Sequence, residues 1–223
     1  RDRIADRLLH RGGASSSGLA DLIIELKSCL TDLDDINIAD VATSRRSLQR
    51  AAEASIESLF VYDLMPMRDG TAPFQWWYLD PCKLVSRCVA ESPLLQARFA
   101  TAVARHPPSH ARPWRVLVGF DEFAPGNKLR VDNLRKCMNL HFTFLELGQD
   151  ALCHEVAWFT PVCVRTVKLH ACEGGFSHFL RNFLRRLMLG VSGLATAGLA
   201  IELGGRSVAI IAKVANLLSD GDG

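Results

Sequence analysis

The sequence predicts a mixed α/β protein, with a sheet in its C-terminal half and helices before it. Two observations support this fold class. From Trp114 onward, apolar residues repeat at every second position in short runs, which is typical of strands. Residues 1–60 instead repeat apolar residues every three or four positions, as one side of a helix does. With 223 residues, of which 48% are hydrophobic and 22% charged, the chain can form a sizeable core.

Residues 1–60 are expected to be a helical region. Apolar residues at helical spacing predict one helix within residues 19–30 and a second within residues 44–60. The stretch 38–50 can also be interpreted as a helix-turn-helix in which Ser44 caps a recognition helix. Side chains suited to phosphate and base contacts then lie on that helix: Arg45, Arg46, Gln49 and Arg50. The alternative is an amphipathic helix with a solvated basic face.

Residues 61–112 are expected to be a helical and aromatic connector. Prolines and glycines interrupt residues 61–80, so the aromatic cluster at 74–79 is predicted to be a packed loop. Aromatic side chains of this kind could also stack on nucleic-acid bases. Residues 81–105 predict helix, and the proline-rich segment 106–113 predicts a linker and a domain boundary.

Residues 113–223 are expected to form the core. The predicted strands follow one another at 114–123, 138–147, 157–166, 199–203 and 206–220. In the second strand, alternation separates an apolar side from a polar side: Leu140, Phe142 and Phe144 against Asn139, His141 and Thr143. Pro161 suggests an edge position or a bulge for the third strand. The glycine pair 174–175 precedes a helix with one apolar stripe, and the pair 204–205 suits a hairpin turn.

Two of these segments end in carboxylates. Asp121 and Glu122 close the first strand, just before a Pro-Gly-Asn turn, and Asp220 and Asp222 follow the last strand in a glycine-rich setting. Because a sheet holds strand ends rigidly, carboxylates there can bind Mg²⁺ or Mn²⁺, which accept hard oxygen ligands. The alternatives are a turn cap for Asp121 and ordinary Asp-Gly turns at the C-terminus.

This order of elements, with an acid pair at the end of the first strand, resembles the ribonuclease H-like core of transposases, integrases and related nucleases. In that superfamily the first catalytic Asp ends the first strand, a second acid follows the first core helix, and a last acid comes from a later helix. The resemblance implies that Asp121 is the first acid and Asp220 the second, with Glu122 and Asp222 as substitutes. It also implies two-metal cleavage or strand transfer on DNA, with Mg²⁺ or Mn²⁺ as cofactor.

The last acid of that pattern has no match before Gly223, and the chain begins at Arg1 rather than at methionine. We therefore expect a fragment that is inactive by itself, with the helix that carries the last acid after Gly223. The alternative function is a non-enzymatic DNA-binding or protein-interaction module of the same fold.

A second resemblance rests on motifs spread over residues 74–223. They are Gly119-Phe-Asp-Glu-Phe-Ala-Pro-Gly-Asn-Lys-Leu129, Arg135-Lys-Cys-Met-Asn139, Phe144-Leu-Glu-Leu147, Trp158-Phe-Thr-Pro161 and Leu218-Ser-Asp-Gly-Asp-Gly223. In these motifs the chain resembles an uncharacterised multicopy protein family of protist genomes, which is similar to mobile-element proteins in its copy number.

Charge and cysteine usage add weaker expectations. The net charge of +2 is too small to indicate a nucleic-acid partner. Arg181 and Arg185, with Lys168 before them, form a basic cluster that can follow a DNA backbone or be a solvated helix face. Seven cysteines occur without a Cys-x-x-Cys spacing, which favours reduced thiols in an intracellular protein, nuclear if it acts on DNA. The longest uncharged stretch, residues 187–201, is shorter than the roughly 18 residues of a membrane span, so no membrane contact is expected.

Overall fold

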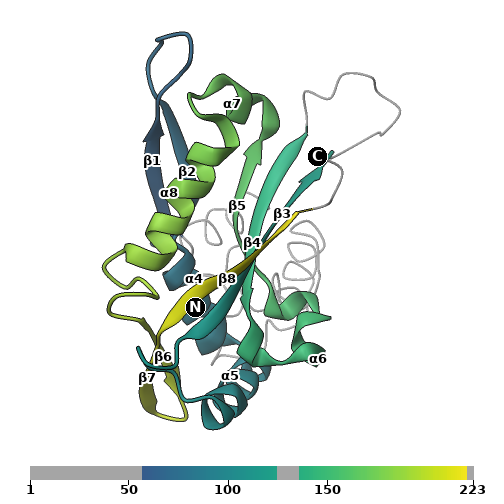
Figure 1. The fold of residues 1–223 in the computed structure, drawn as a ribbon, viewed down its shortest axis with the longest axis vertical. Helices are drawn as coiled ribbons and strands as arrows, with labels where there is room; N and C mark the ends of the chain where they lie inside the picture. The colour runs from purple at the N-terminus through teal and green to yellow at the C-terminus, as the bar shows by residue number, and fades with distance from the viewer. Residues whose placement is uncertain (1–56, 125–135, 220–223) are drawn as a thin grey trace, which may run out of the picture. The chain divides into compact units, whose positions relative to one another are not determined.

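The computed structural model describes residues 57–124 and 136–219. The chain divides into two compact units, residues 1–60 and residues 61–223. The second unit is a mixed α/β fold built on a central sheet, which confirms the mixed α/β class predicted from the sequence (Figure 1). The helices and the helix-turn-helix expected before residue 57 lie outside the described residues.

The central sheet has four strands among the described residues, in the order β5–β4–β3–β8. The strands are β3 (Trp114–Phe123), β4 (Cys137–Phe144), β5 (Phe159–Arg165) and β8 (Ala212–Ser219). β4 is antiparallel to β3 and to β5, whereas β8 runs parallel to β3. The sheet is therefore mixed, and β5, which contains Pro161, lies at an edge as predicted.

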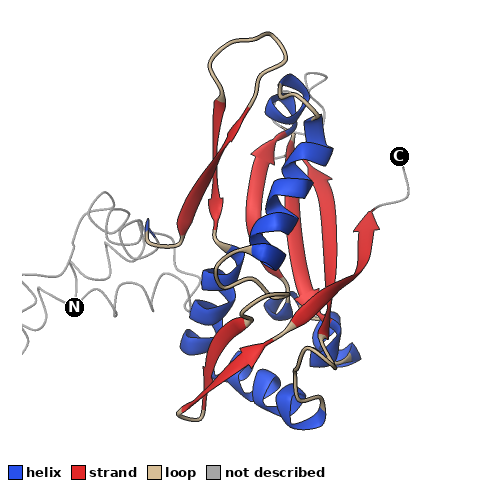
Figure 2. Cartoon of the chain, turned by 60° about the vertical axis from the view of Figure 1, so that its left-hand side comes forward, coloured by secondary structure: helices blue, strands red, loops and turns tan. Residues whose placement is uncertain are grey.

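One face of the sheet, the helix face, is covered by three helices. They are α4 (Pro81–Glu91), α5 (Pro93–Arg105) and α8 (Gly175–Leu189). α8 lies along this face in Figure 2, and the ring centroid of Phe183 is 6.1 Å from that of Phe142 on β4. On α5, the ring centroid of Phe99 lies 5.9 Å from that of Trp114 of β3. Burial of these apolar side chains is the main force that holds the helices on the sheet.

Side-chain caps fix where α4 and α5 begin. Asp80 Oδ1 accepts hydrogen bonds from the backbone N–H groups of Cys82 (3.0 Å) and Lys83 (3.1 Å). Ser92 Oγ accepts one from the N–H of Leu95 at 3.3 Å. A proline follows each cap, where its missing N–H costs nothing. The caps satisfy N–H groups that have no partner within the first turn of a helix.

A hairpin replaces the packed loop that we expected before α4. Its strands are β1 (Phe60–Met65) and β2 (Phe74–Leu79), which lie beside α8 (Figure 2). The prediction was wrong because the prolines and glycines of residues 66–73 only connect two strands. In β2 the side chains alternate, so Trp76 and Tyr78 are buried while Trp77 is exposed.

The last predicted strand is divided at Ile211. Before it, β6 (Leu199–Leu203) and β7 (Arg206–Ile210) form a separate two-stranded sheet. Gly204 and Gly205 join them with φ angles of 57° and 78°, as a two-residue hairpin turn with two left-handed positions requires. At the division, the carbonyl of Ile211 accepts a hydrogen bond from the N–H of Trp114 at 2.8 Å, and from Ala212 onward β8 pairs with β3.

The other face of the sheet, the open face, is covered at one end by a segment of short helices. These are η3 (Leu145–Leu147), α6 (Gln149–Leu152) and η4 (Glu155–Ala157). Thr143 Oγ1 donates a hydrogen bond to the carbonyl of Ala157 at 2.7 Å, and the rings of His141 and Trp158 meet at 5.4 Å. The polar side of β4 therefore faces away from α8, as the alternation predicts. The segment of short helices and Trp158 cover part of it.

Residues 61–112 belong to the same compact unit as residues 113–223. The segment 106–113, which we expected to separate two domains, joins α5 to β3 within this unit. Its ends are tied together, because Trp114 Nε1 donates a hydrogen bond to the carbonyl of His106 at 2.7 Å. The proline-rich composition therefore marks a connection between elements here, and α4 and α5 complete the core of the sheet.

Candidate functional site

Asp121 and Glu122 point to opposite faces of the sheet, because successive side chains of a strand alternate. Asp121 lies on the open face, where β4 places Asn139 directly opposite it. Asn139 is in turn opposite Cys163 of β5, so the three residues form a row across three strands. Asp121 and Cys163 are exposed and Asn139 is half-buried. This end of the open face is where a ligand can reach the Asp121 carboxylate.

Glu122 lies on the helix face and is held by two neighbours. Lys136 Nζ donates a hydrogen bond to its carboxylate at 2.8 Å, and Thr166 Oγ1, at the start of α7 (Thr166–Ala171), donates another at 2.8 Å. The hydrogen bond from Lys136, followed by that from Thr166, holds the pKa of the Glu122 carboxyl below its usual value. Glu122 thus ties β3 to the turn between β5 and α7, and it does not share a face with Asp121.

β8 ends at Ser219, at the same end of the sheet as Asp121. The parallel pairing of β3 with β8 runs as far as Phe120 opposite Ser219. In the sequence, Asp121 follows Phe120 and Asp220 follows Ser219. Asp220 and Asp222 lie outside the described residues, so the meeting of their carboxylates with Asp121 stays a prediction. Among the described residues, no group of three or more His, Cys, Asp or Glu side chains could hold a metal ion.

Arg181 and Arg185 occupy successive turns of α8, and both are exposed. They lie off the buried stripe formed by Phe179, Phe183 and Leu187, as the helical spacing predicts. The other residues expected to contact nucleic acid, Arg45, Arg46, Gln49 and Arg50, lie outside the described residues. The structure therefore places one of the two predicted basic clusters on a solvent-facing surface.

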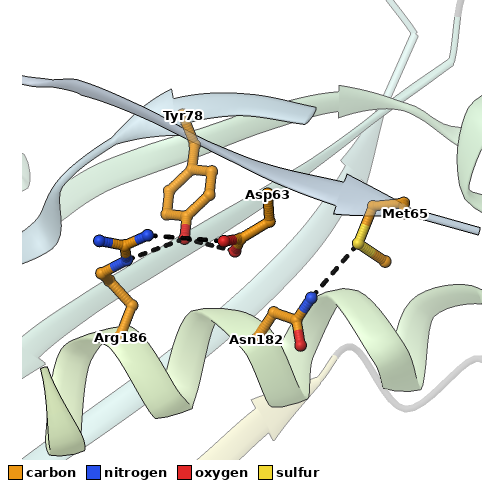
Figure 3. A network of polar contacts seen from close by, with 5 residues as sticks. All are labelled: Asp63, Met65, Tyr78, Asn182 and Arg186. Atoms are coloured by element: carbon orange, nitrogen blue, oxygen red, sulfur yellow. Dashed lines mark hydrogen bonds and ion pairs between the residues drawn. The ribbon is translucent and has the colours of Figure 1, made fainter. Parts of the chain in front are cut away.

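Sequence reasoning missed a polar cluster between β1, β2 and α8 (Figure 3). The buried Tyr78 hydroxyl donates a hydrogen bond to Asp63 Oδ2 at 2.7 Å and accepts one from Arg186 Nε at 3.3 Å. Arg186 also forms an ion pair with Asp63 at 3.5 Å. Burial, together with the hydrogen bond to Asp63, raises the pKa of Tyr78 above its usual value.

This cluster fastens the hairpin to α8 rather than offering a reactive group. Asn182, one turn before Arg186 on α8, adds a contact from its side-chain amide to Met65 Sδ at 3.3 Å (Figure 3). A tyrosine held in its neutral form by burial is a poor base or nucleophile at neutral pH. The alternation of side chains along β2 could have revealed this cluster from the sequence. In a strand, that alternation places Trp76 and Tyr78 together on the side that faces the core.

The chemistry available at the exposed end of the open face is that of oxygen donors. The Asp121 carboxylate and the Asn139 side-chain amide both supply hard oxygen atoms of the kind that Mg²⁺ and Mn²⁺ accept. Cys163 completes the row with a thiol, which suits softer ions. Sequence reasoning found Asp121 from its place at a strand end and missed both partners, because strand register is not visible in one strand alone.

No protein-family model matches this chain, and no curated protein is found to be similar to it. Within the part of the chain that the structure describes, no helix is long and apolar enough to cross a membrane.

Proposed function

We propose that this chain is part of a transposase- or nuclease-like protein with a ribonuclease H-like core, related to mobile-element proteins. Its reaction would be two-metal cleavage or strand transfer of DNA phosphodiesters. The observation that supports this proposal most strongly is the parallel pairing of β3 with β8, in which Phe120 lies opposite Ser219. Each of these residues is followed in the sequence by an aspartate. Neighbouring strands lie about 4.8 Å apart, so acids after the two strands start from close positions.

In this proposal Asp121 is the principal ligand of a divalent cation, and Asp220 is the second ligand. The described residues fit one part of such a site, because the Asp121 carboxylate is exposed beside the amide of Asn139. When bound, Mg²⁺ or Mn²⁺ would stabilise the charge on the attacking and leaving oxygens of a phosphodiester. Asp121 and Asp220 would hold and orient the ions, and the rigid pairing of β3 with β4 would keep Asp121 in place.

Glu122 is a poor substitute for Asp121 in this role. Its carboxylate is already bound by Lys136 and Thr166, and it lies on the other face of the sheet. A cation at Glu122 would first have to displace a lysine ammonium group. We therefore assign the first ligand to Asp121 alone.

The experiment that tests this proposal is Mn²⁺ titration of the full chain, followed by paramagnetic broadening of amide NMR signals. A cation at the proposed site broadens the amides of Asp121, Asn139 and the end of β8 first. Asp121→Asn and Asp220→Asn should each weaken Mn²⁺ binding by about tenfold or more, which corresponds to about 1.4 kcal/mol. Asp150→Asn, an exposed acid at the other end of the sheet, is the matched control and should bind Mn²⁺ as the wild type does. Broadening centred elsewhere, or unchanged binding in both variants, would refute the proposal.

A second candidate is a DNA-binding module without enzymatic activity. It is favoured by the exposed pair Arg181 and Arg185 on α8, which can contact DNA phosphates. The ion pair of Glu122 with Lys136 is consistent with it, because that carboxylate is then not free to bind a metal ion. Such a module binds duplex DNA in the presence of EDTA, and its affinity falls with salt as phosphate contacts are lost.

Fluorescence anisotropy of labelled duplex DNA separates the two candidates. The double variant Arg181→Ala/Arg185→Ala should lower the slope of log affinity against log salt by about 2. The control Arg105→Ala/Arg206→Ala removes the same charge from exposed positions elsewhere and should leave the slope unchanged. Equal slopes for both double variants would exclude α8 as a DNA-binding surface.

A further inference from the structure

Two cysteines of the central sheet are neighbours across β4 and β5. Cys137 lies opposite Arg165, and Cys163 lies opposite Asn139, so the two cysteines are diagonal neighbours on the same face of an antiparallel pair. Their thiols are close enough to form a hydrogen bond with each other. Burial, followed by the neighbouring Cys137, raises the pKa of Cys163.

The pair differs from the other described cysteines in being both accessible and close together. Cys163 is exposed and Cys137 is half-buried. Cys82 and Cys172 are buried. The Cys82 thiol bonds to the carbonyl of Leu187, and the Cys172 thiol bonds to the sulfur of Met67, so neither contacts another cysteine in these bonds. Burial raises the pKa of Cys82 to about 12, which makes its thiolate rare at neutral pH.

We propose that Cys137 and Cys163 form an oxidisable dithiol, which a small-molecule disulfide such as glutathione disulfide converts into an intramolecular disulfide bond. The proposal stands on the strand register and on exposure, and it does not depend on a nuclease activity. It assigns a modification site to the open face, in the row next to Asp121 and Asn139.

The chemistry balances as two thiol–disulfide exchanges. The Cys163 thiolate attacks one sulfur of glutathione disulfide, which forms a mixed disulfide and releases one glutathione thiolate. The Cys137 thiolate then attacks the Cys163 sulfur, which closes the intramolecular bond and releases the second glutathione thiolate. The two protons lost by the cysteines are taken up by the two glutathione thiolates. Two cysteine thiols are oxidised, and one molecule of glutathione disulfide is reduced.

Closure of the disulfide requires a movement of the backbone at this site, because diagonal neighbours of an antiparallel pair lie about 7–8 Å apart. A disulfide requires the two sulfurs to approach from hydrogen-bond contact to bond length, with Cβ atoms about 3.8 Å apart. Cys137 is the first residue of β4, and the carbonyl of Lys136 before it accepts a hydrogen bond from the N–H of Thr166 at 2.9 Å. Closure therefore has to shift this end of β4, whereas the pairing of Leu140 with Val162 lies further along the strand.

The test is oxidation of the full chain with glutathione disulfide, followed by blocking of remaining thiols and mass spectrometry of the peptides. We expect a cross-linked peptide that contains Cys137 and Cys163, with a mass lower by two hydrogen atoms than the two reduced peptides. Cys153 is the matched control, because it is exposed and lies at the other end of the sheet, after α6. It should form only a mixed disulfide with glutathione.

Titration with reduced glutathione makes the comparison quantitative. The Cys137–Cys163 bond should survive at least about tenfold more reduced glutathione than the mixed disulfide on Cys153, because its second step is intramolecular. Cys163→Ser and Cys137→Ser should each convert the remaining partner to a mixed disulfide that is as easily reduced as that of Cys153. Two separate mixed disulfides in the wild type, unreacted thiols, or a bond to any other cysteine would each overturn the proposal.

Discussion

Gly119 has no room for a side chain, because the ring of His141 occupies the space beside it. A Cβ atom on Gly119 would clash with His141 Nε2 and would lie 2.6 Å from His141 Cδ2. The two residues are direct partners across β3 and β4, and the His141 ring is itself packed against Trp158. The glycine therefore serves the close approach of an aromatic ring in the middle of a strand.

We expect Gly119→Ala to lower the free energy of unfolding by about 1–3 kcal/mol, the usual cost of an extra methyl group in a packed site. The measurement is urea unfolding of the single variants and of Gly119→Ala/His141→Ala. Because His141→Ala removes the ring that clashes, the double variant should lose less than the sum of the two single variants. Strict additivity would show that the methyl group is accommodated elsewhere.

Tyr78 links stability to pH at the alkaline end. Its pKa is raised in the folded protein, so the unfolded chain releases the proton first as the pH increases. The stability that this group contributes is complete below about pH 10, the pKa of an unperturbed tyrosine, and is lost as the pH rises beyond it. Cys82 acts in the same direction, since its pKa is also raised, so Tyr78 has to be isolated by substitution.

For Tyr78→Phe we expect a loss of about 1–3 kcal/mol at pH 7, because the hydrogen bond to the charged Asp63 carboxylate is removed. Above about pH 10 the wild-type and variant curves of unfolding free energy against pH should converge. Denaturant unfolding followed by circular dichroism between pH 7 and 11 measures both curves. A difference that stays constant with pH would mean that the Tyr78 hydroxyl titrates alike in both states.

At the scale of single elements, the ends of the helices are set by local chemistry. Asp80 accepts two N–H groups at the start of α4, whereas Ser92 accepts one at the start of α5. The N–H groups at the start of a helix have no hydrogen-bond partner within the helix. Loss of the capping side chain therefore leaves them without a protein acceptor and destabilises the first turn.

We expect Asp80→Ala to cost about 1 kcal/mol of unfolding free energy, and Asp80→Ser to recover most of it, since serine is also a good cap. Asp69→Ala is the control: Asp69 caps no helix, and its hydrogen bonds are to Thr71 in the exposed connection of the hairpin. Thermal and urea unfolding of the three variants measure the difference. An equal loss for Asp80→Ala and Asp69→Ala would contradict the role of the cap.

At the scale of the whole molecule, the hairpin, the helices and the central sheet share one core. Trp76 of β2 packs against Phe179 of α8, with their ring centroids 4.6 Å apart. Trp114 of β3 packs against Phe99 of α5, with their ring centroids 5.9 Å apart. Both tryptophans are buried, and both belong to one hydrophobic core cluster of the unit 61–223. Elements that share a core in this way unfold together.

Single-tryptophan variants of the full chain test this cooperativity. All four tryptophans, Trp76, Trp77, Trp114 and Trp158, lie in the unit 61–223. In variants that keep only Trp76 or only Trp114, with the others changed to phenylalanine, we expect the same denaturation midpoint by fluorescence. Midpoints that differ by more than the experimental error would place a domain boundary between β2 and β3.

The central strands and α8 could be predicted from the sequence. The prediction failed where strands are short or where one apolar stretch contributes to two different sheets. The run 114–123 is apolar and rich in valine, and the stripe of Phe179, Phe183 and Leu187 has a clear helical period. The hairpin before α4 was missed because each of its strands is six residues long and a proline-rich connection lies between them. The division at Ile211 was missed because only the pairing with Trp114 reveals it.

The candidate site was predictable only in part for the same reason. A carboxylate at a strand end is visible in the sequence, and Asp121 was found in that way. Its neighbours Asn139 and Cys163 come from two other strands, whose register depends on long-range packing that a single segment does not specify.

The position of β8 also determines when the sheet next to Asp121 can be completed during folding, because β8 is the edge strand that pairs with β3. β3 and β4 are nearby in the chain, whereas residues 121–218 all lie between the paired Phe120 and Ser219. Closing so long a loop costs entropy before its contacts repay it, so the strand pair that borders the candidate site is expected to assemble last. On a ribosome or after dilution from denaturant, three strands and their helices can already be in place while this edge is still missing.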